Sequence, residues 1–169
     1  MVAATVYSVA RYVREHVTGG DAWKTQKLMY YVQAWSLVWR NRPAFAEPIE
    51  AWKDGPVCPA LRRAMQFTPT QVSNAPALSM EDQAHIDRVL AAYGGMSSDA
   101  LVEQSHRERP WRDARGNVAS DARTNVVITH ESMAAYFGAL QAEASEDANE
   151  KGGWSGTSDQ LDAFIDALD

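Results

Sequence analysis

Two stretches of the chain carry charged and polar residues at spacings that could support binding or catalysis. In the first, Lys27 stands at the start of an apolar run, and Glu50 begins the turn-rich segment 50–57. A lysine beside so apolar a run needs a carboxylate or a wet cleft, and Glu50 is the candidate partner. The pair either contributes to a binding site or is an internal ion pair that fixes the segment to a helix. We expect Gly55 and Pro56 to make a tight turn.

The second stretch is the densest basic run of the chain, and it surrounds His106 and Trp111. Its arginines could make bidentate contacts to an acidic surface or to phosphate. The alternative is a solvated loop whose arginines pair with neighbouring carboxylates. Taken alone, His106 fits a hydrogen-bonded structural histidine better than a catalytic base. The arginines are Arg107, Arg109, Arg112 and Arg115, and the candidate carboxylates are Glu103, Glu108 and Asp113.

Catalytic, metal and phosphate-loop chemistry find little support in the sequence. Cys58 is the single cysteine and has no histidine near it in sequence, so nothing supports a thiol nucleophile. The histidines (His16, His85, His106 and His130) lack the spacing of metal ligands. No glycine-rich loop followed by Lys-Ser/Thr is present. We therefore expect a protein that is not an enzyme and that uses no metal and no cofactor.

The length and cysteine content indicate one cytoplasmic domain with an appendage. A chain of 169 residues is long enough to bury a sizeable core without disulfides. A single cysteine excludes an intramolecular disulfide and fits a reducing compartment. We expect no membrane association, because no apolar run approaches the length of a bilayer span and no secretion signal begins the chain.

The charge is concentrated at the C-terminal end. Residues 143–169 contain eight acidic residues and one lysine, whereas residues 1–142 contain 14 acidic and 15 basic residues. An acidic extension would be repelled by phosphate and would compete with it for arginines. This distribution disfavours nucleic acid as a partner and favours a basic protein.

The strongest secondary-structure signal is an apolar helix that extends from a cap at Asp21 to about Asn41. Between residues 28 and 39 only Gln33 and Ser36 are clearly polar, so this helix must be buried on every side. Prolines exclude a helix from the next segment, 42–57, which we expect to be extended, as a short hairpin or an edge strand. The fold class is therefore mainly α: a compact helical domain around a central buried helix, with a small β element.

Apolar periodicity and capping residues place the other elements of this domain, which we assign to residues 1–142. Residues 68–80 read as a loop, and residues 107–125 read as charged and irregular. A short strand is expected at 126–128. Helices are expected from residue 6 to the glycines at 19 and 20, from 59 to 67, from the Ser79 cap to 93, from 97 or 98 to 106, and after Thr129 through 140.

The remaining residues, 143–169, read as an acidic, glycine-containing linker up to residue 157 and a short amphipathic helix. The helix carries the strictest apolar stripe of the chain, at i, i+3, i+4 and i+7. At about ten residues it would be marginal alone in water, so it needs a surface on which to fold. That surface belongs either to a partner or to its own domain. The stripe is Leu161, Phe164, Ile165 and Leu168, and Trp154 lies within the linker.

Two groups of residues at fixed spacing resemble the Panacea domain of the SocA-like antitoxin family. The likeness covers roughly residues 6–140. It departs at Cys58, where an aliphatic residue is usual, and at Asp21-Ala22, where Thr-Pro is common. The first group is Lys27-Leu28, Tyr30-Tyr31, Ala34-Trp35, Phe45, residues 47–52 (Glu-Pro-Ile-Glu-Ala-Trp) and residues 55–57 (Gly-Pro-Val); the second is Leu101-Val102, Ser105-His106 and Pro110-Trp111.

This resemblance implies an antitoxin that neutralises a cognate toxin by direct contact, in a family associated with bacteria and phages. It also implies an alternative, a proteolytic adaptor that delivers a toxin to a AAA+ protease. A nucleic-acid-binding regulator is a third interpretation, and the oligomeric state stays open. The residues expected to bind the partner are Lys27, Tyr31, Trp35, Glu50, Trp52, Gly55, Pro56, His106, Trp111, Trp154, Leu161, Phe164 and Ile165.

Overall fold

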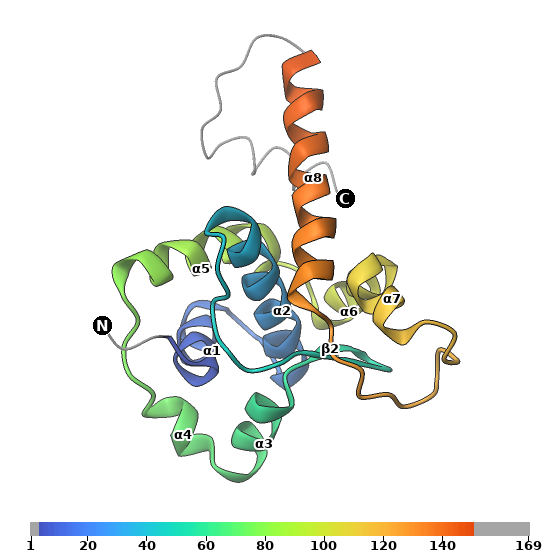
Figure 1. The fold of residues 1–169 in the computed structure, drawn as a ribbon. Coiled ribbons are helices and arrows are strands. Elements are labelled where there is room, and N and C mark those ends of the chain that lie inside the picture. Colours follow the sequence, from blue (N-terminus) through green and yellow to red (C-terminus); the bar gives the residue numbers. More distant parts are fainter. Residues whose placement is uncertain (1–3, 151–169) are drawn as a thin grey trace.

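Helix α2 (Ala22–Trp39) lies at the centre of the fold, and most other elements pack around it (Figure 1). The computed structural model describes residues 4–150, with side chains described up to residue 147. The mainly α fold class is confirmed. The other elements are α1 (Val6–His16), β1 (Glu50–Trp52), β2 (Gly55–Val57), α3 (Pro59–Phe67), α4 (Pro69–Ser73), α5 (Met80–Tyr93), α6 (Ser98–Arg107), α7 (Arg109–Arg115) and α8 (His130–Glu150).

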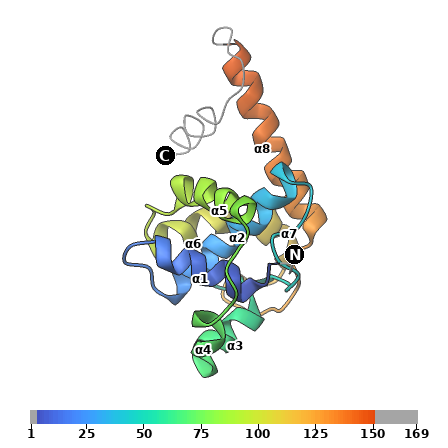
Figure 2. The ribbon, with the colours of Figure 1, turned by 90° about the vertical axis from the view of Figure 1, so that its left-hand side faces the viewer.

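The predicted burial of the central helix is confirmed. The Asp21 carboxylate caps α2 by accepting a hydrogen bond from the Lys24 amide at 2.7 Å. Every residue from 24 to 36 is buried, because helices α1, α5, α6 and α8 and the hairpin cover different sides of α2. The view turned by 90° shows α2 enclosed among these elements (Figure 2). No helix within residues 4–150 combines the length and apolarity needed to cross a bilayer.

Aromatic side chains of α2 form the centre of the hydrophobic core. The Tyr31 ring stacks on Tyr93 of α5 with centroids 4.0 Å apart, and Trp35 packs edge-to-face on Phe137 of α8 at 5.1 Å. The indole N–H of Trp35 donates to the Tyr93 hydroxyl at 3.0 Å. These contacts join α2, α5 and α8 through large, buried side chains.

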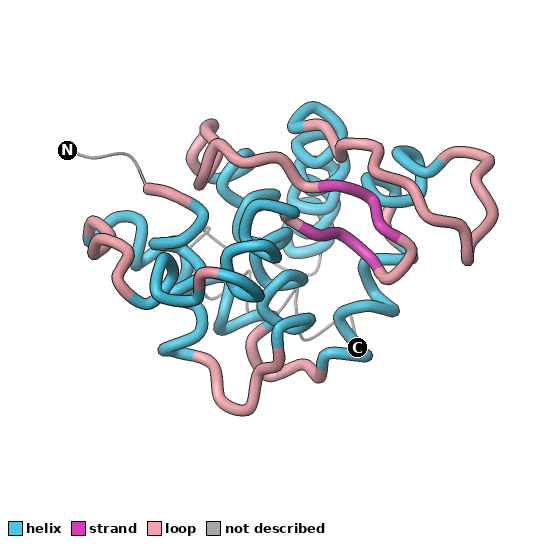
Figure 3. Tube along the Cα trace, turned by 90° about the horizontal axis from the view of Figure 1, so that it is seen from below, coloured by secondary structure: helices cyan, strands magenta, loops and turns pink. Residues whose placement is uncertain are grey.

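The predicted extended segment is a two-stranded antiparallel hairpin, drawn in magenta in Figure 3. Glu50 pairs with Val57 and Trp52 pairs with Gly55. The strand expected at 126–128 is reduced to a single bridge between Val127 and Glu50, on the outer side of β1. Two backbone hydrogen bonds flank this bridge: Ala51 N donates to Val126 O, and Ile128 N donates to Ile49 O, both at 2.8 Å.

Two segments expected to be irregular contain short helices. Helix α4 lies inside the expected loop 68–80, and α7 lies inside the charged stretch 107–125. Both carry a proline in the first turn, where the missing N–H has no helical partner to lose. Prolines and charged residues are both common in loops, so the sequence predicts irregular structure here. In the fold, each of these prolines instead begins a short helix.

The linker predicted from residue 143 is wrong for its first eight residues. Helix α8 continues without a break to Glu150 and projects away from the body of the domain (Figure 1). Residues 141–150 contain neither glycine nor proline and are rich in alanine and glutamate, which favour helix over linker. Acidic residues at 143, 146 and 147 are exposed on this projecting part of α8.

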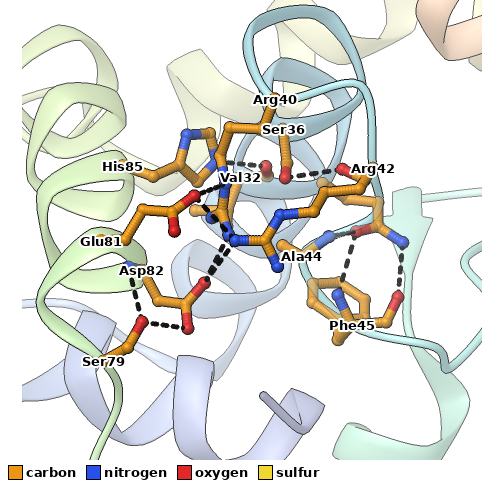
Figure 4. Close-up of polar contacts among 11 residues, drawn as sticks. Val32, Ser36, Arg40, Arg42, Ala44, Phe45, Ser79, Glu81, Asp82 and His85 are labelled. Atoms are coloured by element: carbon orange, nitrogen blue, oxygen red, sulfur yellow. Dashed lines mark hydrogen bonds and ion pairs between the residues drawn. The ribbon is translucent and has the colours of Figure 1, made fainter. Parts of the chain in front are cut away.

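The C-terminal half of α2 is tied to the loop that follows it by buried hydrogen bonds. The Gln33 side-chain oxygen accepts from the amides of Ala44 (2.8 Å) and Phe45 (3.3 Å). Its amide nitrogen donates to Phe45 O at 2.9 Å. The Ser36 hydroxyl donates to Arg42 O at 2.8 Å, a contact drawn in Figure 4. Side chains of α2 thereby provide hydrogen-bond partners for the backbone groups of the turn that follows the helix.

Ion pairs to α5 hold the same loop from outside (Figure 4). Arg40 donates to Asp82 at 2.5 Å, and Arg42 donates to Glu81 at 2.8 Å. The predicted cap is confirmed: the Ser79 hydroxyl accepts from the Asp82 amide at 3.1 Å and donates to the Asp82 carboxylate at 2.7 Å. We call Gln33, Ser36, Arg40, Arg42, Ala44, Phe45, Glu81 and Asp82 the loop clamp.

Candidate partner-binding site

The two groups of motif residues meet beside the N-terminal half of α2, where the hairpin packs against α6. The ammonium group of Lys27 is fully buried and donates to the Pro56 carbonyl at 3.0 Å. It also lies 5.2 Å from the centre of the Trp23 ring. Lys27, Gly55, Ser105, His106 and Trp111 make up what we call the hairpin cluster.

The predicted ion pair between Lys27 and Glu50 is wrong. The Glu50 carboxylate instead accepts a hydrogen bond from the Trp52 indole N–H at 2.7 Å. No salt bridge within residues 4–150 includes Lys27. Burial lowers the pKa of Lys27 to about 7, against the opposing attraction of Asp54. Burying the ammonium group under the hairpin therefore lowers the stability of its charged form.

Gly55 does more than complete a turn. Its φ of +100° is a conformation that side-chain-bearing residues rarely adopt. A Cβ at this position would lie 2.7 Å from Lys27 Cε and 3.1 Å from Ser105 Oγ. The absence of a side chain therefore lets the hairpin approach both α2 and α6, and it explains glycine at this motif position.

The His106 ring is held by stacking. Its centroid lies 4.0 Å from that of Trp111, with 15° between the ring planes. The His106 Nε2 atom is buried without a hydrogen-bond partner among the described residues, contrary to the expected hydrogen-bonded histidine. Burial, and then the charge of Lys27, lower the pKa of His106. The Trp111 indole N–H donates to Trp52 O at 2.8 Å, which connects the cluster to the hairpin.

The basic run divides into paired surface arginines and a buried one. Arg107 pairs with Glu103, and Arg109 pairs with Asp113 at 3.3 Å, as the solvated interpretation predicted. Arg115 is instead buried and stands 4.9 Å from the centre of the Trp111 ring. Its guanidinium donates to the Ala51, Ala119, Ser120 and Ala122 carbonyls.

Glu108 was expected among these solvated pairs, and that expectation is wrong. It lies in the interior, between α6 and α7, and accepts a hydrogen bond from the Tyr31 hydroxyl. Burial raises the pKa of Glu108 to about 8, although the bond from Tyr31 acts in the opposite direction. The carboxyl is therefore largely protonated at neutral pH, and its hydrogen bond with Tyr31 belongs to the interior of the fold.

Several residues expected to contact a partner have no surface to offer. Tyr31 and Trp35 are 0% exposed, and Gly55 and Pro56 are buried with Lys27 beneath the hairpin. Their surface is used inside the chain, so any contribution to binding is indirect. Trp111 is 7% exposed, whereas Glu50, Trp52 and His106 are half-buried.

The exposed feature next to the hairpin cluster is a cleft of about 550 Å³ between the hairpin, α2 and α3. Trp23 and Trp52 form its apolar part, and the Arg62 guanidinium stands 5.3 Å from the centre of the Trp52 ring. A second cleft of about 380 Å³ shares Trp23 and Arg62 with it. We call the two together the aromatic cleft. Its other residues include Lys53, Asp54, Arg123, Thr124 and Asn125 in the first part, and Arg14, Gln26, Met65 and Pro69 in the second.

A comparison with protein families identifies the domain. The model of the family described as antitoxin SocA-like, Panacea domain, matches residues 25–112. The chain belongs to this family. It is also 32% identical over 103 residues to the antitoxin SocA of Caulobacter vibrioides (strain NA1000 / CB15N), an alignment that covers 51% of this chain and 55% of that protein. The chain thus spans about half the length of this curated relative, and no solved structure matches it.

The Panacea match contains the whole hairpin cluster but only part of the aromatic cleft. Trp52, Lys53 and Arg62 lie inside the matched residues, whereas Trp23 and Arg123 lie outside them. The buried support of the site therefore falls within the residues that match the family, and part of its exposed rim falls outside them.

Sequence reasoning missed Trp23, Arg62 and Arg123. Trp23 offers a signal in retrospect: it lies in the polar first turn of α2, where a tryptophan has no core to enter, and it is 37% exposed. Nothing in the sequence places Arg62 and Arg123 together, because 60 residues separate them and only the fold brings them to one cleft.

Metal ligation and thiol reactivity concern the His, Cys, Asp and Glu side chains of the described residues. Within residues 4–150 no group of three or more His, Cys, Asp or Glu side chains could hold a metal ion. Cys58 is buried, and that burial raises the pKa of its thiol. The predicted contacts Trp154, Leu161, Phe164 and Ile165 lie outside the described residues.

Proposed function

We propose that this Panacea-domain chain is the antitoxin of a toxin–antitoxin system and neutralises its cognate toxin by direct contact in the cytoplasm. The supporting observation is that the family-matched hairpin cluster carries an exposed cleft of tryptophan and arginine. These two residue types are enriched among the residues that dominate binding energy at protein interfaces. The name of the curated relative, an antitoxin, agrees with this role.

In this proposal the buried motif residues prepare the surface rather than touch the toxin. Trp52 is held twice: its indole N–H donates to Glu50, and its carbonyl accepts from Trp111. Gly55 and Lys27 fix the hairpin on α2. A surface ordered before binding loses less conformational entropy on association, which increases affinity.

The acidic C-terminal part supplies the second contact in the proposal. The exposed acids of α8 and the apolar stripe of residues 161–168 would bind a basic face of the toxin. Charges of this kind chiefly accelerate encounter and select the partner. Apolar anchors such as Leu161, Phe164 and Ile165 would each contribute on the order of 1–4 kcal/mol to binding.

The test is growth rescue in cells that express the toxin, taken as the product of the adjacent gene. Two variants are needed: Trp23→Ala with Trp52→Ala, and a truncation after Glu150 that leaves α8 entire. Both should lose at least about tenfold in plating efficiency. The control is Met80→Ala, since Met80 is 87% exposed on α5 and does not line the aromatic cleft. Full rescue by both variants would contradict the proposal.

Toxin abundance separates direct neutralisation from delivery to a AAA+ protease. Direct contact leaves the toxin at its normal level but inactive, and the purified chain and toxin should form a complex without other proteins. An adaptor would shorten the toxin's lifetime in protease-competent cells and would not protect cells that lack the protease. That second pattern would reject neutralisation by direct contact.

A further inference from the structure

The segment beside β1 leaves one edge of the small sheet open. Val127 bridges Glu50, and both cross-links are made by its neighbours, through Val126 O and Ile128 N. In this antiparallel pattern the N–H and C=O of Val127 point away from β1. No backbone hydrogen bond within residues 4–150 uses them. Val126 and Val127 are each 45% exposed, so the edge is accessible and apolar.

This open edge adjoins the aromatic cleft. Successive side chains of a strand alternate between the two faces of a sheet, so Glu50 and Trp52 lie on the same face. Val127 lies opposite Glu50, and the antiparallel register places Asn125 opposite Trp52 on that face. Trp52 and Asn125 both line the cleft. A chain laid along residues 125–127 would therefore place its alternate side chains towards Trp52.

The cleft is basic in a chain that carries a net charge of −6. Four cationic side chains line its two parts, and Asp54 is the one acidic residue that lines them. No salt bridge within residues 4–150 includes any of these cations. The cations are Arg14, Lys53, Arg62 and Arg123. Such a site complements negative charge.

We propose that the aromatic cleft and the edge at residues 125–127 bind an extended acidic segment of a partner protein. The segment adds a strand beside Val127, places apolar side chains against Trp23 and Trp52, and pairs its carboxylates with Arg62 and Arg123. This inference deepens the proposed function, since the segment would belong to the toxin. It differs from the role of the acidic C-terminal part, which meets a basic face.

A peptide fits these features better than a nucleic acid does. An unpaired backbone N–H and C=O recognise another peptide backbone, whereas a nucleic acid has no such alternating pattern. The exposed Val126 and Val127 suit contact with apolar side chains of a peptide.

The first experiment selects ligands for the full chain from a random library of peptides of about 12 residues. The selected sequences should be rich in Asp and Glu, with aliphatic or aromatic residues at alternate positions. A synthetic peptide of the consensus should bind Arg62→Glu/Arg123→Glu at least about tenfold more weakly than wild type. Arg107→Glu/Arg109→Glu is the matched control, because both arginines are exposed and outside the cleft.

The second experiment tests the strand without altering the protein. The same peptide, N-methylated at alternate residues, cannot pair along one of its edges. Methylation on the edge that faces Val127 should weaken binding at least about tenfold, whereas methylation of the opposite edge should leave it unchanged. Equal binding of both methylated peptides would overturn the added strand.

Two further outcomes would overturn the inference as a whole. One is a selection without acidic enrichment. The other is an oligothymidylate that binds wild type but not Arg62→Glu/Arg123→Glu, which would assign the cleft to nucleic acid. Acidic peptides that bind while the chain fails to neutralise toxin would reject the antitoxin role alone. If the Arg62→Glu/Arg123→Glu variant neutralised the toxin at full strength, the role of this surface in toxin binding would be rejected, but the antitoxin role would stand.

Discussion

The two halves of α2 are stabilised in different ways. The loop clamp, at the C-terminal half, matches polar groups with partners: Gln33 makes three hydrogen bonds to the following loop, and Arg40 and Arg42 pair with acids on α5. Within residues 4–150, the hairpin cluster at the N-terminal half buries Lys27 with a single carbonyl acceptor and leaves His106 Nε2 without a hydrogen-bond partner. The loop clamp pairs its buried polar groups by hydrogen bonds except at Arg40 Nε, which lies 3.6 Å from the Glu81 carboxylate, whereas the hairpin cluster buries a whole ammonium group.

Under the proposed function, the loop clamp serves folding and the hairpin cluster prepares a binding surface. A loop held by neutral hydrogen bonds and ion pairs contributes stability. The hairpin cluster accepts a buried ammonium group and a glycine at positive φ, and in return it presents Trp52 in a fixed position. Unfavourable local features of this kind concentrate at functional sites.

The largest effect is expected from Gln33→Met in the loop clamp. Methionine keeps the volume but leaves the buried Ala44 and Phe45 amides and the Phe45 carbonyl without partners. We expect the free energy of unfolding in urea to fall by about 3 kcal/mol. Arg42→Ala is the control and should cost less than about 1 kcal/mol, because that ion pair is exposed. A loss below about 1 kcal/mol in Gln33→Met would remove the contrast between the two halves.

Gly55→Ala tests the hairpin cluster and should cost about 2–3 kcal/mol. The new methyl group is strained by φ of +100° and meets Lys27 Cε at 2.7 Å. Gly19→Ala is the matched control: its φ is +69° but nothing lies within 4 Å of an added Cβ, so it should cost only about 1 kcal/mol. Lys27→Ala should make Gly55→Ala less costly in a double-mutant cycle. Equal costs for the two glycines would show that the close packing is unimportant.

Glu108→Gln tests the buried carboxyl through the pH dependence of stability. The folded pKa, about 8, lies above the ordinary 4.5, so between these values the folded state holds a proton that the unfolded state has lost. The wild-type free energy of unfolding therefore decreases as pH rises through this window. Glu108→Gln should reduce that decrease by on the order of 2 kcal/mol. Lys27 has the opposite effect, at higher pH. Its folded pKa of about 7 lies below the ordinary 10.5, so its contribution to the free energy of unfolding increases as pH rises between these two values.

The control for this titration is Glu103→Gln, because Glu103 is exposed and paired only with Arg107 on the same helix. Its unfolding free energy should keep the wild-type dependence on pH. If Glu108→Gln also kept that dependence, the carboxyl would not be protonated in the fold, and the hairpin side of α2 would hold a buried anion instead.

The sequence sufficed to predict the regular parts of the fold, because these depend on local pattern. The apolar run of α2, its Asp21 cap and the Ser79 cap of α5 were all readable from residue order. The short helices α4 and α7 were missed because proline is compatible with both a turn and a helix start. The charge pattern predicts too short a helix α8, because acidic residues are common in linkers, whereas the alanines and glutamates of this segment favour helix.

The candidate site was only half predictable. Motif residues such as Lys27 and Gly55 were identified, but their burial was not, because exposure depends on how the hairpin packs on α2 and α6. Glu50 is the clearest example: charge suggested Lys27 as its partner, and packing gave it the Trp52 indole instead. The exposed rim combines residues from α2, α3 and the segment 123–125, a combination that only the tertiary fold specifies.

The smallest effect on stability is expected from Trp23→Ala, which sharpens the comparison by separating binding from folding. Trp23 is 37% exposed and lies in the first turn of α2, so its removal should change the free energy of unfolding by no more than about 0.5–1 kcal/mol. Binding of an acidic consensus peptide, measured by calorimetry, should nevertheless weaken about tenfold, because an apolar wall of the cleft is lost. A loss of several kcal/mol in stability with unchanged binding would make Trp23 part of the core and return the N-terminal half of α2 to a purely structural role.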